Sequence, residues 1–247
     1  MSRPPFIRAA LAALLASAAL SAQALTLTLT GFAGGSQSLT GTMPNGAGPG
    51  TIGIPANGGV GAFQGTLTGP GAPTINPFYT YCVELTEYFS FSTTPLSGYT
   101  LVDGLSYFTN PAKPSNGATI VERLGKLFTH LGGSGLPTSA EDSAARQIAV
   151  WESVYEGTAY GELKTGAMNS GLFHISTNSY ARDVANSMLA AAAGVTNIMY
   201  SIQVLQKTGS QDFIVVQRIP EPGSLALAGI ALFGLAGVAG TARRRRG

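Results

Sequence analysis

The segment from Leu25 to Thr30 alternates leucine with threonine, so a strand here would place its three leucines on one face. Turn-forming Gly, Pro and Asn residues then separate further short apolar runs as far as Pro77. Residues 25–77 are therefore expected to form a glycine-rich β region. Further runs have strand-like composition, and the two richest in aromatic residues come last: Thr51–Ile54, Val60–Leu67, Phe78–Leu85 and Tyr88–Phe91.

The hydrophobic period then lengthens from that of a strand to that of a helix. Apolar residues in Ile120–Leu131 recur at helical spacing, and Gly132-Gly133 follows as a stop signal. A second helix has Thr138 or Ser139 as its N-cap, acidic residues in its first turn and Gly157 at its end.

A third helix and two closing strands complete the predicted elements. The helix is expected from Tyr180 to Ala193, and the strands at Tyr200–Gln206 and Asp212–Gln217. Strands thus stand at both ends of the region, with about three helices inserted between them. The predicted fold class is α+β.

The first 24 residues have the organisation of a secretory signal peptide. Arg3 and Arg8 precede an uncharged apolar stretch that ends in Ala22-Gln23-Ala24, a small-residue cleavage site. A helix in the core of a soluble domain would want a polar face, and this stretch has none. Residues 1–24 are therefore predicted to direct export and to be removed.

Residues 220–247 have a tripartite order. Pro220, Glu221 and Pro222 open it, an uncharged run of 21 residues extends from Pro222 to Ala242, and four arginines close it: Arg243, Arg244, Arg245 and Arg246. As a helix this run would be about 31 Å long, which matches the hydrocarbon core of a bilayer. The arginine cluster would stay on the cytoplasmic side.

This order resembles the PEP-CTERM sorting signal of Gram-negative bacteria that make exopolysaccharide, with Ile219 where a valine often precedes the motif. The resemblance implies that an exosortase-type membrane protease recognises the signal and cleaves near it. The transmembrane helix would then anchor the chain in the inner membrane only transiently. The mature product would be residues 25–219, on the cell surface or in the extracellular matrix.

Charge and motif content narrow the function classes of residues 25–219. This region holds 8 basic and 11 acidic side chains, a net charge of −3, so binding to nucleic acid is not expected. His130 and His174 have no neighbours at metal-ligand spacing, and the chain contains no phosphate-binding or nucleophile-elbow motif. We therefore expect no metal, no cofactor and no enzymatic activity.

Cys82 and Gln147 are the two residues whose chemistry asks for an explanation. Cys82 is the only cysteine, on the more polar face of its predicted strand, and an unpaired thiol in an exported protein invites oxidation. On the second helix, Gln147 lies about 40° from Trp151 inside the apolar stripe, whereas Glu152 points elsewhere. A buried carboxamide without partners would cost about 1–3 kcal/mol, so something must satisfy or consume it.

Two motifs resemble those of bacterial thioester domains in surface adhesins: Tyr81-Cys82-Val83-Glu84-Leu85 and Gln147-Ile148-Ala149-Val150-Trp151-Glu152. The resemblance implies that the Cys82 thiol and the Gln147 side chain join as an internal thioester, with loss of ammonia. Many members have threonine where this chain has Arg146 and isoleucine where it has Val150. The aromatic side chains of Tyr81 and Trp151 are candidates to shield the bond from water.

The chemistry of a thioester suggests its use. It is a stronger electrophile than an amide, so an amine or hydroxyl of a surface protein or glycan would attack the Gln147 carbonyl carbon and release the Cys82 thiol. Because a nearby cation lowers the pKa of a cysteine, Arg146 is expected to favour the reactive thiolate.

Three hypotheses follow for the exported region. The first is a surface or matrix protein that attaches covalently to a partner through the Cys82–Gln147 thioester. The second is a structural or adhesive matrix protein that keeps the fold without the bond. The third is a hydrolase that uses Cys82 with His130 or His174 as its base.

Overall fold

The computed structural model describes residues 24–44, 51–53, 59–69, 72–85, 87, 91, 94–110, 117–155, 173–177 and 179–219. The predicted signal helix and the predicted transmembrane helix lie outside the described residues, as do Tyr88, Phe89 and Gly157. Among the helices that are described, none combines the length and hydropathy needed to span a bilayer.

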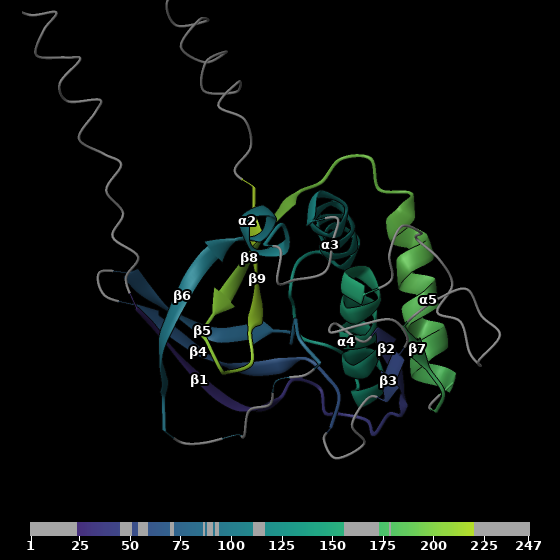
Figure 1. The fold of residues 1–247 in the computed structure, drawn as a ribbon, viewed down its shortest axis with the longest axis horizontal. Helices are drawn as coiled ribbons and strands as arrows, with labels where there is room; N and C mark the ends of the chain where they lie inside the picture. Colours follow the sequence, from purple (N-terminus) through teal and green to yellow (C-terminus); the bar gives the residue numbers. More distant parts are fainter. Residues whose placement is uncertain are drawn as a thin grey trace, which may run out of the picture. The chain divides into compact units, whose positions relative to one another are not determined.

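A six-stranded sheet forms one side of the unit that extends to Gln217 (Figure 1). Its strand order is β5-β4-β1-β6-β8-β9, and β1 pairs antiparallel with both β4 and β6. Leu27 and Leu29 of β1 are buried, so the alternation of leucine and threonine predicted this strand correctly. The strands are β1 (Leu25–Phe32), β4 (Phe63–Gly69), β5 (Ala72–Thr80), β6 (Leu96–Asp103), β8 (Tyr200–Gln206) and β9 (Phe213–Arg218).

The two ends of this sheet meet where the chain leaves β5. Cys82 lies just beyond β5 and forms an isolated antiparallel bridge with Phe213 of β9. Two backbone hydrogen bonds, each 3.0 Å long, flank this pair: Val83 N–H to Asp212 O and Ile214 N–H to Tyr81 O. The first and last strands in the sheet order are therefore connected through the segment that carries Cys82.

A second, smaller sheet has the order β3-β2-β7. It consists of β2 (Gly41–Pro44), β3 (Thr51–Gly53) and β7 (His174–Ile175), and both of its pairings are antiparallel. Its strands belong to the glycine-rich β region and to the segment before the last helix. The sequence pattern predicted β3 but neither β2 nor β7.

Four helices appear among the described residues, where the sequence predicted about three: α2 (Gly104–Phe108), α3 (Gly117–Leu131), α4 (Ala140–Tyr155) and α5 (Ser179–Ala193). The additional helix, α2, spans five residues and is capped by Asp103, whose side chain accepts a hydrogen bond from Ser106 N–H at 3.1 Å. So short a segment cannot show the hydrophobic repeat of a helix. Strands and helices together confirm the α+β class.

The predicted helix boundaries are confirmed where they are described. After α3, Gly132 and Gly133 adopt positive φ angles of 72° and 108°, a left-handed conformation that favours glycine at a helix end. At the start of α4, Ser139 Oγ accepts a hydrogen bond from Asp142 N–H at 3.1 Å, so Ser139 is the N-cap. Gly194 follows α5.

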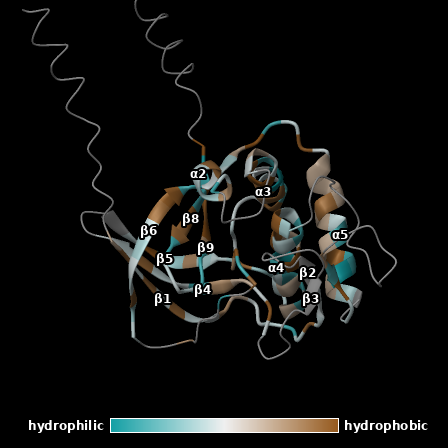
Figure 2. Cartoon of the chain, viewed as in Figure 1, coloured by the Kyte–Doolittle hydropathy of each residue, from teal (hydrophilic) through white to brown (hydrophobic). Residues whose placement is uncertain are grey.

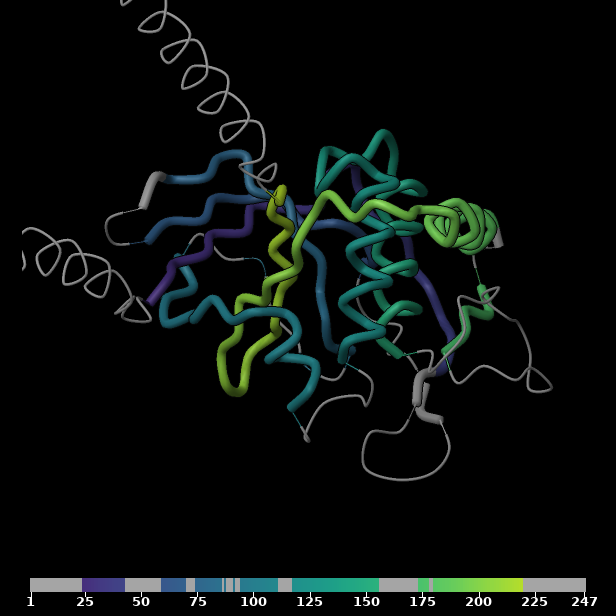
Figure 3. The backbone as a smooth tube through the Cα atoms, turned by 90° about the horizontal axis from the view of Figure 1, so that it is seen from above, coloured from purple at the N-terminus to yellow at the C-terminus, as the bar shows by residue number. Residues whose placement is uncertain are grey.

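The helix α4 occupies the centre of this unit. The helices gather on one side of the six-stranded sheet, and α5 packs along α4 (Figures 1 and 3). Hydrophobic and hydrophilic stretches are mixed along α4 and α5 in Figure 2. Because α4 is covered on nearly all sides, even Glu152, which the helical period places outside the apolar stripe, is only 3% exposed.

Close contact between β1 and β4 predicts a glycine requirement at Gly65. A Cβ atom there would collide with the Thr28 carbonyl oxygen, whereas a Cβ atom at Gly31 would meet nothing within 4 Å. Gly65→Ala should lower the free energy of unfolding by about 2 kcal/mol or more. The matched variant Gly31→Ala should change it by less than about 1 kcal/mol. Denaturant titration of both variants tests this, and equal effects would contradict it.

Candidate functional site

The structure brings Cys82 and Gln147 into direct contact. The Cys82 backbone N–H donates to Gln147 Oε1 at 2.9 Å, and Gln147 Nε2 donates to the Cys82 carbonyl oxygen at 3.0 Å. Cys82 is 7% exposed and Gln147 is 1% exposed. The sequence left open what satisfies the buried Gln147 carboxamide. The structure shows that the backbone of Cys82, the residue to which the thioester-domain resemblance links Gln147, supplies both partners.

The strand geometry explains why the Cys82 backbone is available to a side chain. Tyr81 and Val83 direct their hydrogen-bonding groups toward β9, so the N–H and C=O of Cys82, which lies between them, face the opposite side. On that side the pairing of β4 with β5 ends at Phe63 and Thr80. Gln147 takes the place of the missing strand because a carboxamide offers the same donor and acceptor as a peptide group.

Two more side chains of α4 bind the backbone where β4 and β5 separate. Ser143, one helical turn before Gln147, accepts a hydrogen bond from Ala62 N–H at 2.9 Å through its Oγ atom. At the end of the helix, Tyr155 Oη accepts one from Leu85 N–H at 3.1 Å. One helix therefore holds both chain segments that leave the sheet.

The two residues predicted to shield the site, Tyr81 and Trp151, both lie in the hydrophobic core. Tyr81 precedes Cys82 in the chain, and Trp151 follows Gln147. Tyr81, beside Cys82, is fully buried, and its ring centroid lies 5.4 Å from that of Phe128 in α3. Trp151, one turn after Gln147, is 6% exposed, and its ring lies 6.4 Å from that of Phe173. Both are large, buried aromatic side chains.

The electrostatics of Cys82 differ from the sequence prediction. Burial, together with the nearby Glu84 carboxylate, raises the pKa of the Cys82 thiol well above its usual range. The prediction that Arg146 favours the thiolate is therefore wrong. At neutral pH the thiol is protonated, which protects it from oxidation because the thiolate is the reactive form.

Arg146 has other partners. Its guanidinium forms two hydrogen bonds of 3.0 Å with the Asp142 carboxylate and one of 2.9 Å with the Gly135 carbonyl oxygen. Burial alone would raise the pKa of Asp142, but hydrogen bonds from Arg146 and from Thr138 lower it. Arg146 thus ties the first two turns of α4 to the preceding loop, and its charge is neutralised locally.

Neither histidine lies on the Cys82 segment or on α4, the two parts of the chain that form the site. His130 is exposed near the end of α3. His174 lies on β7, where its Nδ1 atom is 2.7 Å from Thr42 Oγ1. This arrangement gives no support to the hypothesis of a cysteine hydrolase with a histidine base.

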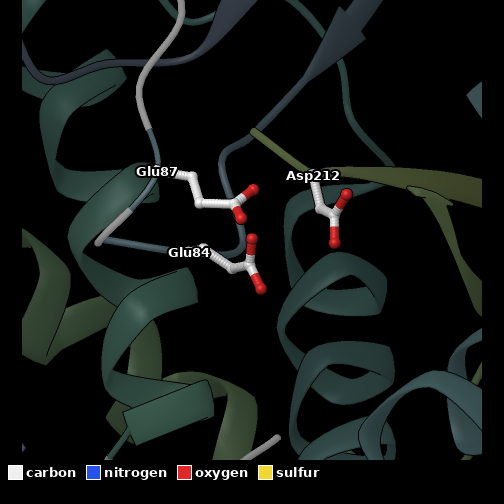
Figure 4. Close-up of side chains that lie close together, drawn as sticks. All are labelled: Glu84, Glu87 and Asp212. Atoms are coloured by element: carbon white, nitrogen blue, oxygen red, sulfur yellow. The ribbon is translucent and has the colours of Figure 1, made fainter. Parts of the chain in front are cut away.

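Three carboxylates converge close to the Cys82 segment, as Figure 4 shows: those of Glu84, Glu87 and Asp212. One oxygen of each lies within 4.8 Å of the others, and such oxygens are ligands for hard divalent cations. Tyr107 Oη lies 2.7 Å from Asp212 Oδ2 and 3.2 Å from Glu84 Oε1. Lys207 N–H donates to Asp212 Oδ1 at 2.9 Å, so hydrogen bonds hold Asp212 in this position.

Sequence reasoning did not identify Ser143, Tyr155 or Asp212 as part of the site. Ser143 and Tyr155 belong to the same helix as Gln147, so the helical period could have placed Ser143 on its face. Asp212 reaches the site only because β9 closes the sheet next to Cys82, and no local pattern signals that pairing.

Comparison of the chain with protein-family models, with curated proteins and with solved structures gave no match.

Proposed function

We propose that the exported domain forms an internal thioester between Cys82 Sγ and Gln147 Cδ and uses it to attach covalently to a partner. The observation that carries this proposal is the pair of hydrogen bonds that seats the Gln147 carboxamide on the Cys82 backbone. The contact is buried, and it joins the two motifs that resemble those of bacterial thioester domains.

The contact geometry suits the formation of the bond. The Cys82 sulfur adds to Gln147 Cδ, the C–N bond breaks, and ammonia leaves with the proton that the thiol gives up. Cys82 N–H already donates to Gln147 Oε1, so it is placed to stabilise the negative charge that develops on this oxygen. The Cys82 carbonyl oxygen holds Nε2, the nitrogen of the leaving group.

The partner supplies the second nucleophile. An amine or hydroxyl of a surface protein or glycan attacks Cδ, the C–S bond breaks, and the sulfur ends as a thiol with the proton of the nucleophile. The product is an amide or ester that crosslinks the two molecules. Because the bond is consumed, the protein acts once and is not an enzyme.

Burial serves both states of the site. Before bond formation, the raised thiol pKa keeps Cys82 protonated and slow to oxidise during export. Afterwards, the aromatic side chains of Tyr81 and Trp151 limit access of water to the thioester.

We further propose that residues 1–24 direct export and that an exosortase-type protease processes the PEP-CTERM signal at residues 220–247. The protein would pass through transient inner-membrane anchoring to the cell surface or extracellular matrix of a Gram-negative bacterium that makes exopolysaccharide. The position of β9 supports this, because it ends at Arg218. Cleavage near Pro220 would leave every described strand and helix in the mature product.

A structural or adhesive matrix protein without the thioester is the second candidate. The observation that favours it is that the hydrogen bonds between Gln147 and Cys82 are complete without a covalent bond. In that function Cys82 keeps a free, buried thiol and Gln147 only braces the strand edge.

The intact mass of the protein distinguishes these two functions. Protein produced from the full chain should be lighter by one ammonia than its processed sequence requires. Methylamine should open the bond, leave an N-methyl amide on Gln147 and free the Cys82 thiol.

The matched controls are Cys82→Ala and Gln147→Ala, which should each show the full mass for their sequence and not react with methylamine. If the unaltered protein has its full sequence mass and also ignores methylamine, the structural candidate replaces the thioester.

The sorting proposal has its own test. Replacing Pro220, Glu221 and Pro222 by alanine should leave the precursor uncleaved in the membrane fraction, because the protease loses its recognition motif. Replacing Gly223, which lies outside the motif, by alanine should leave processing unchanged. Immunoblots of membrane and extracellular fractions provide the readout. Normal release of the triple variant would rule out this sorting route.

A further inference from the structure

Tyr155 makes a second contact between α4 and the segment that carries Cys82. Its Oη atom accepts the hydrogen bond from Leu85 N–H at 3.1 Å. Its ring stacks on that of Phe173, with centroids 6.3 Å apart and planes inclined by 20°. The ring is therefore held by packing, and the hydroxyl has a defined position.

The two contacts match in spacing. Cys82 and Leu85 lie three residues apart, a span of about 10 Å in an extended chain. Gln147 and Tyr155 lie eight residues apart on a helix, a span of about 12 Å. The segment thus runs beside α4 and is bound to it at both ends.

The contact between Tyr155 and Leu85 adds to the orientation that the Gln147 contact gives the Cys82 segment. The hydrogen bonds to Gln147 and to the β9 segment hold the chain from Tyr81 to Val83. Tyr155 holds the same chain two residues further on, at Leu85 N–H, and so limits how far the segment can bend away from α4. Reactions between two held groups depend strongly on such orientation.

We propose that Tyr155 is a positioning residue for thioester formation, which rests on the function proposed above: its hydroxyl fixes the Cys82 segment so that the sulfur faces Gln147 Cδ. Burial raises the pKa of Tyr155 although the hydrogen bond from Leu85 lowers it, and Glu84 and Cys82 lie close enough to raise it further. Tyr155 therefore stays protonated at neutral pH.

The test measures the rate of thioester formation in protein whose thioester has first been opened. Ammonia opens the thioester, restoring the Gln147 carboxamide and the Cys82 thiol. After ammonia is removed, the mass of the protein is followed as the bond forms again. Tyr155→Phe keeps the ring on Phe173 but removes the acceptor for Leu85 N–H. It should slow bond formation about fivefold to tenfold, as expected for one lost hydrogen bond.

The matched control is Tyr200→Phe. It also removes one tyrosine hydroxyl, which donates to Gly132 O at 2.9 Å near the end of α3. This variant should form the bond at the rate of the unaltered protein.

A second rate separates positioning from general loosening of the fold. Once the thioester exists, the covalent bond itself holds Cys82, so Tyr155→Phe should change the rate of opening by methylamine less than about twofold. Slow formation with unchanged opening supports the inference.

Other outcomes overturn it. Formation at the normal rate in Tyr155→Phe, faster opening in that variant, or equal slowing in Tyr200→Phe would each reject the positioning role while leaving the thioester in place. An unaltered protein that never loses ammonia would reject the thioester and the positioning role together.

Discussion

The pairing of one side-chain carboxamide with one backbone residue determines the organisation of this site. Cys82 lies where the sheet has no further strand, so its N–H and C=O would be buried without partners, at a cost of about 1–3 kcal/mol each. Gln147 satisfies both groups and is satisfied by them. The same contact that completes the strand edge also brings a carbonyl carbon to a cysteine, so the structural requirement and the proposed chemistry coincide.

This contact depends on distant parts of the chain. Val83 and Ile214 pair the Cys82 segment with β9, and that pairing turns the Cys82 backbone groups toward α4. Because β9 is the last described strand, the site is complete only after nearly the whole region from Leu25 to Arg218 has folded. In the proposed function, the electrophile therefore forms only in a finished domain, when the thiol is already buried and protonated.

Local pattern predicted most of the elements but not how they meet. The Leu25–Thr30 alternation, the glycine stop after α3 and the Ser139 cap all act within a few residues, and each was confirmed. The helix α2 and the strand β7 were missed because they are too short to show a period. The eight-residue strand β6 was missed because its buried positions do not alternate, and the strand predicted at Phe78–Leu85 lies earlier in the chain, as β5. The Cys82 pKa was predicted wrongly because tertiary burial decided it, and tertiary burial also covers Glu152, which the helical period places outside the apolar stripe. The roles of Tyr155 and Asp212 arise from contacts between elements, which periodicity does not record.

Since the chain has one cysteine, a count of thiols is the most direct measure of the proposed bond. The protein would be reduced with a phosphine, denatured and titrated with a thiol reagent, before and after exposure to methylamine. The account predicts no titratable thiol before exposure and one per chain afterwards. One thiol per chain at the outset, unchanged by methylamine, would contradict it.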